Sequence, residues 1–162
     1  MLDGMLGKLT RWLRILGHNV RYAKALDDET LIKTAKAEKR ILLTRDVELY
    51  QRATSRHAEA FLVEGENEAE RLASLSMRFD LSLEFNPNIS RCSRCNTKIR
   101  PADKEEIGYK IPRLTKAFYQ DFWECPKCGK VYWQGAHWSR ITETLNEARR
   151  IQKKRVELVI LR

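Results

Sequence analysis

The sequence lacks a long hydrophobic run, a secretion leader and any low-complexity tract, and these absences bound its class. A membrane span needs about 18 consecutive apolar residues, and no stretch of the 162 residues approaches that length. The opening "MLDGMLGKLTRWLR" has neither the apolar core nor the small-residue cleavage site of a signal peptide. With 43% hydrophobic residues, the chain has enough apolar material for a core. We therefore expect a folded cytoplasmic protein without membrane contact.

Cysteine is scarce, and its distribution coincides with an imbalance of charge. All four cysteines follow residue 91, and the same region holds the basic excess. Residues 1–90 contain 14 basic and 14 acidic side chains, whereas residues 91–162 contain 17 and 8. The net charge of +9 thus belongs to the second part of the chain. A partner rich in phosphate would suit this charge, although a soluble surface without a partner explains it equally well.

The cysteines form two C-x-x-C pairs separated by 29 residues: Cys92 and Cys95, then Cys125 and Cys128. A cytoplasmic protein keeps its thiols reduced, which argues against two disulfides. Each pair predicts a tight turn that presents two thiolates, and two such turns supply the four tetrahedral ligands of Zn²⁺. Because all four positions are filled, the sequence predicts a structural zinc rather than a catalytic one.

Strand-like and helix-like patterns alternate over residues 1–83. Short apolar or β-branched runs predict strands, and apolar residues at helical spacing predict the helices between them. Alternation with short links predicts a parallel sheet covered by helices. The predicted strands are 1–3, 19–23, 40–44 and 59–63, and the predicted helices are 4–16, 28–37, 47–53 and 67–80.

The rest of the chain divides by composition. The linker "EFNPNIS" precedes the first cysteine pair, and helical spacing returns near residue 139. We expect an α/β domain over 1–85, a zinc ribbon over 86–138, and a C-terminal helix with an apolar tail over 139–162. The tail, "VELVILR", is expected to form a strand or a homodimer contact.

Carboxylates follow three of the predicted strands. Asp3 follows the first strand, Asp27 and Asp28 follow the second, and Asp46 follows the third. The carboxyl ends of parallel strands share one edge, where ligands bind. Clustered carboxylates there would suit Mg²⁺ or Mn²⁺, which activates water for phosphodiester hydrolysis. The competing interpretation is structural, since Asp is also a preferred residue at helix N-caps and in turns.

Neighbouring polar and cationic residues would complete such a site. Thr44 is expected to orient a carboxylate or a metal-bound water, and either Arg45 or the pair Lys8 and Arg11 is expected to hold a phosphate. Beyond the second cysteine pair, "VYWQGAHW" holds aromatic rings that either stack on unpaired bases or pack the ribbon against the first domain. We favour packing, because large aromatic side chains are more often buried.

Several stretches taken together resemble the Mut-seven C-terminal ribonuclease family, in the family's order and over nearly the whole chain. They are "LDGMLGKLTRWLRILGHNV", "DDETLIKTAK", "RILLTRDVEL", "RCSRCN", "ECPKCG" and "VYWQGAHW". The resemblance implies a PIN-like nuclease fold that carries a zinc ribbon. It also implies that Asp3, Asp28 and Asp46 bind Mg²⁺ or Mn²⁺ and cut RNA.

Two functional hypotheses follow from the residues and the resemblance. The first is a metal-dependent ribonuclease whose zinc ribbon helps to bind single-stranded RNA. The second is an RNA-binding or ribosome-associated adaptor that has the fold without the catalysis. A fourth acidic ligand is not assigned by the sequence, and Asp27, Glu29 and Glu48 are the candidates.

Overall fold

A computed structural model describes residues 1–160 and shows a mixed α/β protein with a small parallel sheet. Strands β1 (Leu42–Thr44) and β2 (Ala60–Leu62) pair in parallel, as the sequence predicts for 40–44 and 59–63. The residue after β2, Val63, donates its backbone N–H to the carbonyl of Thr44 at 2.7 Å. All of β1 is buried, which explains why its sequence is apolar up to Thr44.

The first two predicted strands are present only as single-residue bridges. Leu2 bridges in parallel to both Leu43 and Tyr22, so the residue 1–3 segment lies between β1 and the residue 19–23 segment. The stub expected at 1–3 agrees with this bridge, whereas the strand expected over 19–23 is wrong in length. After Asp3 the chain turns at once into the 3-10 helix η1 (Gly4–Leu6), which leaves too few residues for a longer ladder.

Six α-helices surround or extend these strands. Most of the predicted helices begin at a residue whose side chain accepts a backbone N–H, which is the usual N-cap arrangement. Asp27 caps α2, Asp46 caps α3 and Asn67 caps α4. The helices are α1 (Gly7–Ile15), α2 (Asp28–Ala37), α3 (Val47–Ser55), α4 (Glu68–Phe79), α5 (Arg113–Phe118) and α6 (His137–Ile160).

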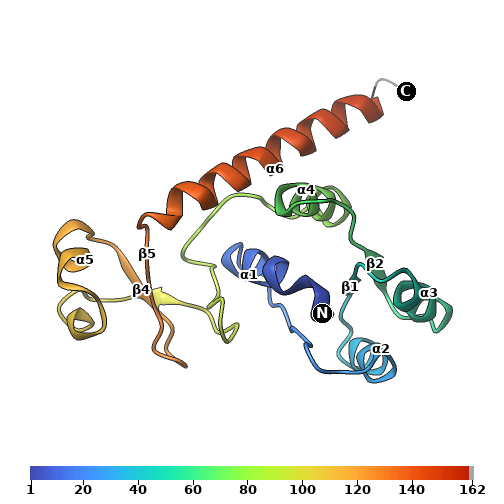
Figure 1. Ribbon diagram of the computed structural model, residues 1–162, viewed down its shortest axis with the longest axis horizontal. Helices are drawn as coiled ribbons and strands as arrows, with labels where there is room; N and C mark the ends of the chain where they lie inside the picture. The colour runs from blue at the N-terminus through green and yellow to red at the C-terminus, as the bar shows by residue number, and fades with distance from the viewer. Residues whose placement is uncertain (161–162) are drawn as a thin grey trace.

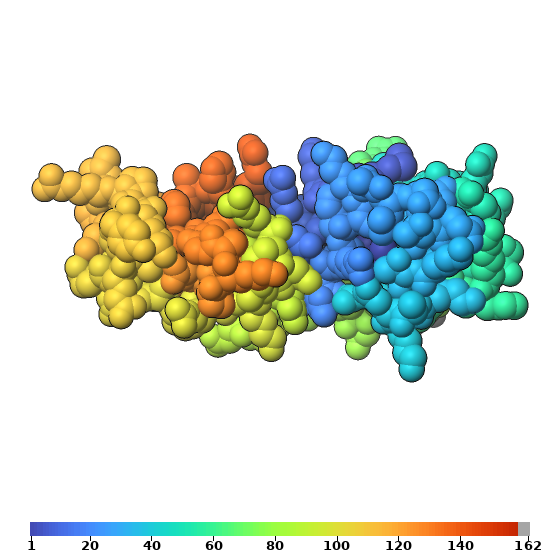
Figure 2. Space-filling view, turned by 90° about the horizontal axis from the view of Figure 1, so that it is seen from below, coloured from blue at the N-terminus to red at the C-terminus, as the bar shows by residue number. Residues whose placement is uncertain are grey.

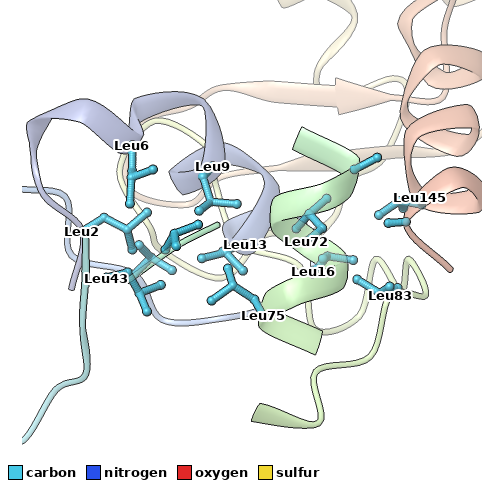
Figure 3. Close-up of a cluster of buried hydrophobic side chains, with 14 residues drawn as sticks. Leu2, Leu6, Leu9, Leu13, Leu16, Leu43, Leu72, Leu75, Leu83 and Leu145 are labelled. Carbon is cyan, nitrogen blue, oxygen red and sulfur yellow. The ribbon is translucent and has the colours of Figure 1, made fainter. Parts of the chain in front are cut away.

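The main core joins helices from both ends of the chain (Figure 3). Leu9 and Leu13 of α1 face Leu72 of α4, and all three are at most 3% exposed. Leu145 of α6 is buried in the same cluster. The C-terminal helix α6 packs along α4 and so extends the main core (Figure 1).

The cysteine region forms a second, antiparallel sheet. Its strand order is β3 (Arg100–Pro101), β4 (Phe122–Glu124) and β5 (Val131–Trp133). Helix α5 and a second 3-10 helix, η2 (Gly108–Lys110), lie between β3 and β4 in sequence. This region has only a small core of three buried apolar residues: Ile107, Ile111 and Phe122. It forms one end of an elongated molecule (Figure 2).

The C-terminal segment differs from its prediction. Helix α6 continues to Ile160, so the strand expected from residue 156 onward is wrong over the described part of the tail. The side chains of Val156 and Leu158 in this helix are 43% and 63% exposed. The homodimer contact remains a prediction, and residues 161–162 lie outside the described residues. Over residues 1–160, every helix is too short or too polar to cross a bilayer.

Candidate functional site

The four cysteines converge at one end of the ribbon, as their spacing predicts. Their sulfur atoms all lie within 4.8 Å of one another, and they form the one cluster of three or more metal-ligating side chains of this kind in residues 1–160. The Sγ atoms of Cys92 and Cys128 are 3.5 Å apart, and those of Cys95 and Cys125 are 3.4 Å apart. These distances are far too long for disulfides, whose S–S bond is about 2.05 Å.

Each cysteine pair lies on a turn of the same design. Asn96 donates its backbone N–H to the carbonyl of Cys92, and Gly129 does the same to Cys125, both at 2.9 Å. Asn96 and Gly129 both have a positive φ, near 69° and 67°, in the left-handed region that Asn and Gly tolerate. The residue after each C-x-x-C therefore reverses the chain and brings both thiols to one side.

The geometry and chemistry of this site fit zinc. Zn–S bonds of about 2.3 Å in a tetrahedron place sulfur atoms about 3.8 Å apart, close to the spacing in the structure. A hydrogen bond with Thr97 lowers the pKa of Cys95 to about 6, whereas burial raises the pKa of Cys125 to about 12. Metal binding must displace the proton of Cys125, because only the thiolate is a ligand.

The aromatic residues beyond the second pair mainly pack, as favoured from the sequence. The hydroxyl of Tyr132 donates to the sulfur of Cys92 at 3.1 Å, which orients a proposed metal ligand from outside the cluster. Trp138 meets Phe85 edge to face at 4.3 Å between ring centroids. Trp133 is 36% exposed, so it keeps part of its ring at the surface. His137 is exposed and lies outside the cysteine cluster.

Arg14 fastens the first cysteine turn to helix α1. Its guanidinium donates to the carbonyls of Ser93 at 3.0 Å and Arg94 at 3.3 Å, and to that of Val20 at 2.9 Å. Arg14 is only 8% exposed, and burial lowers its pKa, while Cys92 and Cys95 act in the opposite direction. The buried cation therefore lies beside thiolates that would carry net negative charge around zinc.

At the carboxyl edge of the parallel sheet, Thr44 links two of the predicted acidic residues. Its hydroxyl donates to Oδ2 of Asp3 and accepts the backbone N–H of Asp46 at 2.9 Å. Asp3 is 5% exposed and also accepts the N–H of Met5 at 2.8 Å. Thr44 thus contacts Asp3 directly, and its role in orienting a carboxylate for a metal remains a prediction.

Asp28 does not share the hydrogen bonds that link Asp3 and Asp46 through Thr44. Its carboxylate forms an ion pair with Arg52 of α3, and the N-cap of α2 is Asp27, which accepts from Thr30 at 3.0 Å. Hydrogen bonds to Thr30 lower the pKa of Asp27. Among the described residues, these carboxylates do not gather as a three-ligand cluster in the way the cysteines do. Asp28 would have to exchange Arg52 for a metal to join Asp3 and Asp46.

The cationic residues predicted to hold phosphate are all at the surface. Lys8 and Arg11 lie on α1, and Arg45 lies between β1 and α3; all three are exposed.

Sequence reasoning missed Arg14 and Tyr132, which contact the cysteine turns from elements distant in sequence. Arg14 follows a run of core leucines and Tyr132 follows the second pair, but their partners depend on the tertiary fold.

The structure first defines the class: a mixed α/β protein that carries a four-cysteine ribbon. The chain belongs to the Mut7-C RNAse domain family, since the family model matches residues 1–145. This confirms the resemblance found in the sequence motifs. Searches of curated proteins and of solved structures found no match.

Proposed function

We propose that this protein is a divalent-metal-dependent ribonuclease with a PIN-like nuclease domain over 1–85. A zinc ribbon over 86–138 and a C-terminal segment over 139–162 complete the proposed organisation. The family to which the chain belongs is described as an RNAse domain, which supports RNA as the substrate. The observation that carries the proposal within the structure is the Asp3–Thr44–Asp46 linkage at the carboxyl edge of the sheet.

The donor chemistry at this edge suits a hard cation. Asp3 and Asp46 offer carboxylate oxygens, which Mg²⁺ and Mn²⁺ prefer over nitrogen or sulfur. Burial of Asp3 beside apolar Leu2 and Leu43 would make an added positive charge favourable there. Asp28, released from Arg52, is the proposed third ligand. The carboxylates of Asp27, Glu29 and Glu48 remain the candidates for a fourth.

In the proposed mechanism the residues of this chain position the reactants. When bound, the metal would lower the pKa of a water and offset charge on the phosphodiester. Asp3, held by Thr44 and by the Met5 N–H, keeps a fixed orientation. The Asp46 carboxylate is held at the start of α3, because its Oδ1 accepts the backbone N–H of Leu49 at 3.0 Å. Exposed Arg45 follows β1 and would contact a phosphate oxygen of the bound RNA.

The proposal is tested by cleavage of a labelled single-stranded RNA with zinc-loaded protein. We expect cutting with Mg²⁺ or Mn²⁺, and none when both are omitted or replaced by Ca²⁺, which is larger and less strictly octahedral. Chelators are avoided because they would also remove the zinc. RNA binding without cutting in either metal would contradict the proposal and support the adaptor hypothesis.

A further inference from the structure

A basic groove runs between helix α1 and the first cysteine turn. It has a volume of about 520 Å³. One wall comes from the first domain, with Arg11 on α1 and Lys24 after the residue 19–23 segment. The other wall comes from the ribbon, with Arg94 and Lys130. Hydrogen bonds from Arg14 and Arg91 hold the first cysteine turn against α1 and so bring the two walls together.

The charge of this groove is all of one sign. No Asp or Glu lines it, and Arg11, Lys24, Arg94 and Lys130 are all exposed. Within residues 1–160 none of these four forms an ion pair. By contrast, Arg21, Arg40, Arg52 and Arg56 each pair with a carboxylate. Unpaired cations that converge on a concave surface focus a positive potential and attract anions.

The position of the groove connects it to the carboxylate edge. The backbone of Lys24 lies against Gly4: a Cβ on that glycine would be 3.2 Å from the Lys24 carbonyl. Gly4 directly follows Asp3, and Tyr22 of the groove donates its hydroxyl to the Gly4 carbonyl at 2.9 Å. Two lining residues of the groove, Tyr22 and Lys24, thus contact the residue that follows the proposed catalytic carboxylate, and the opposite wall is the cysteine turn.

The size and lining of the groove indicate its ligand. A volume near 520 Å³ is that of a pocket for a drug-sized molecule, which a few nucleotides of one strand match and a duplex exceeds. The lining is mainly polar, so it suits ribose and phosphate better than stacked bases. Lys130, within 5.1 Å of the Tyr132 ring centroid and 3.4 Å from Ser93 Oγ, is already held near the groove.

We propose that this groove binds the phosphate backbone of single-stranded RNA and guides the strand from the cysteine turn to the Asp3 edge. The inference rests on the proposed ribonuclease function for the identity of the ligand. It assigns a new role to Lys24, Arg94 and Lys130, and it extends the predicted role of Arg11. The ribbon contributes phosphate contacts directly, in addition to its zinc.

The two cysteine turns provide a matched pair of variants. Arg94 is the third residue of C-S-R-C, and Lys127 is the third residue of C-P-K-C; both are exposed, but only Arg94 lines the groove. Arg94→Gln and Lys127→Gln each remove one positive charge at the same position of a turn. Binding is measured by fluorescence anisotropy with a labelled single-stranded RNA over a range of NaCl concentrations, without Mg²⁺ or Mn²⁺ so that metal-dependent cutting does not occur.

We expect Arg94→Gln to weaken binding several-fold and to reduce the slope of log K against log[salt] by about 0.7, the value for one phosphate contact on a single strand. Lys127→Gln should leave the slope unchanged. The triple variant Lys24→Gln, Arg94→Gln, Lys130→Gln should lower the magnitude of the slope by about 2. Equal effects of the Arg94 and Lys127 substitutions, or an unchanged slope in the triple variant, would overturn the inference.

Zinc content and circular dichroism check that the variants keep the ribbon. If Arg94→Gln loses zinc, Lys24→Gln tests the other wall, which is outside the cysteine turns. Because binding is measured without Mg²⁺ or Mn²⁺, this test does not depend on whether the protein cuts RNA. If the protein cuts RNA in a metal-dependent way but the groove variants bind RNA as the native protein does, the groove proposal is wrong and the ribonuclease proposal stands.

Discussion

Asp46→Asn is expected to lower the rate of RNA cleavage by about 10²- to 10³-fold without unfolding the protein. A metal ion supplies several kcal/mol of transition-state stabilisation, and each 1.36 kcal/mol is tenfold in rate. Asn caps a helix about as well as Asp, so α3 should keep its N-cap through the Leu49 N–H. The substitution therefore removes the charge of the proposed ligand and little else. Cleavage rates and urea unfolding of the same preparations measure the two effects.

A matched control exists in the ribbon. Asp103 accepts the backbone N–H of Glu105 at 2.7 Å in a turn, so Asp103→Asn makes the same chemical change at another carboxylate that accepts a local backbone N–H. We expect the Asp103 variant to cut RNA at the native rate. If the Asp46 variant cuts as fast as the Asp103 variant, Asp46 has no part in the proposed mechanism. If the Asp46 variant does not fold, Asp3→Asn takes its place in the same comparison.

Loss of zinc is the second change with a large expected effect. Cys125→Ser should reduce the bound zinc from about one per chain to nearly none, because Cys125 is fully buried and its thiolate has no substitute. Structural zinc contributes about 10–16 kcal/mol of apparent folding free energy in small modules. The three buried apolar residues of the ribbon core cannot replace that contribution.

The expected result is local. Backbone amides of residues 90–133 should lose protection from hydrogen exchange, while those of β1 and α4, in the main core, should retain it. Metal analysis by mass spectrometry gives the zinc content of the same samples. The control is Ser93→Ala, which changes a residue between two ligands without removing a sulfur. If Cys125→Ser retains one zinc and full protection of the ribbon, the four-cysteine assignment is wrong.

Local chemistry explains which features the sequence revealed. The helix starts at Asp27, Asp46 and Asn67 are encoded within a few residues, because a cap needs only a side-chain oxygen and the next turn. The zinc ligands are similarly local, since each C-x-x-C turn closes on itself. The caps by Asp residues and the cysteine cluster were predicted from residue types and spacing, and the cysteine cluster is confirmed by its geometry.

Features that depend on distant partners were beyond the sequence. Arg14 is buried because the carbonyls of Ser93 and Arg94, about 80 residues away, accept its hydrogen bonds. Asp28 pairs with Arg52 of another helix, which no spacing rule predicts. The residue 19–23 segment was expected to be a strand, but it meets the residue 1–3 segment through a single bridge at Tyr22, and this depends on the distant partner Leu2.

The most direct test of the central claim is the position of Mn²⁺ in crystals of the zinc-loaded protein, located by anomalous diffraction at the manganese edge. We expect a peak between the carboxylates of Asp3 and Asp46, with Asp28 rotated away from Arg52 toward it, and zinc alone at the cysteines. Manganese absent from this edge at a concentration that supports RNA cleavage would contradict the proposed catalytic site.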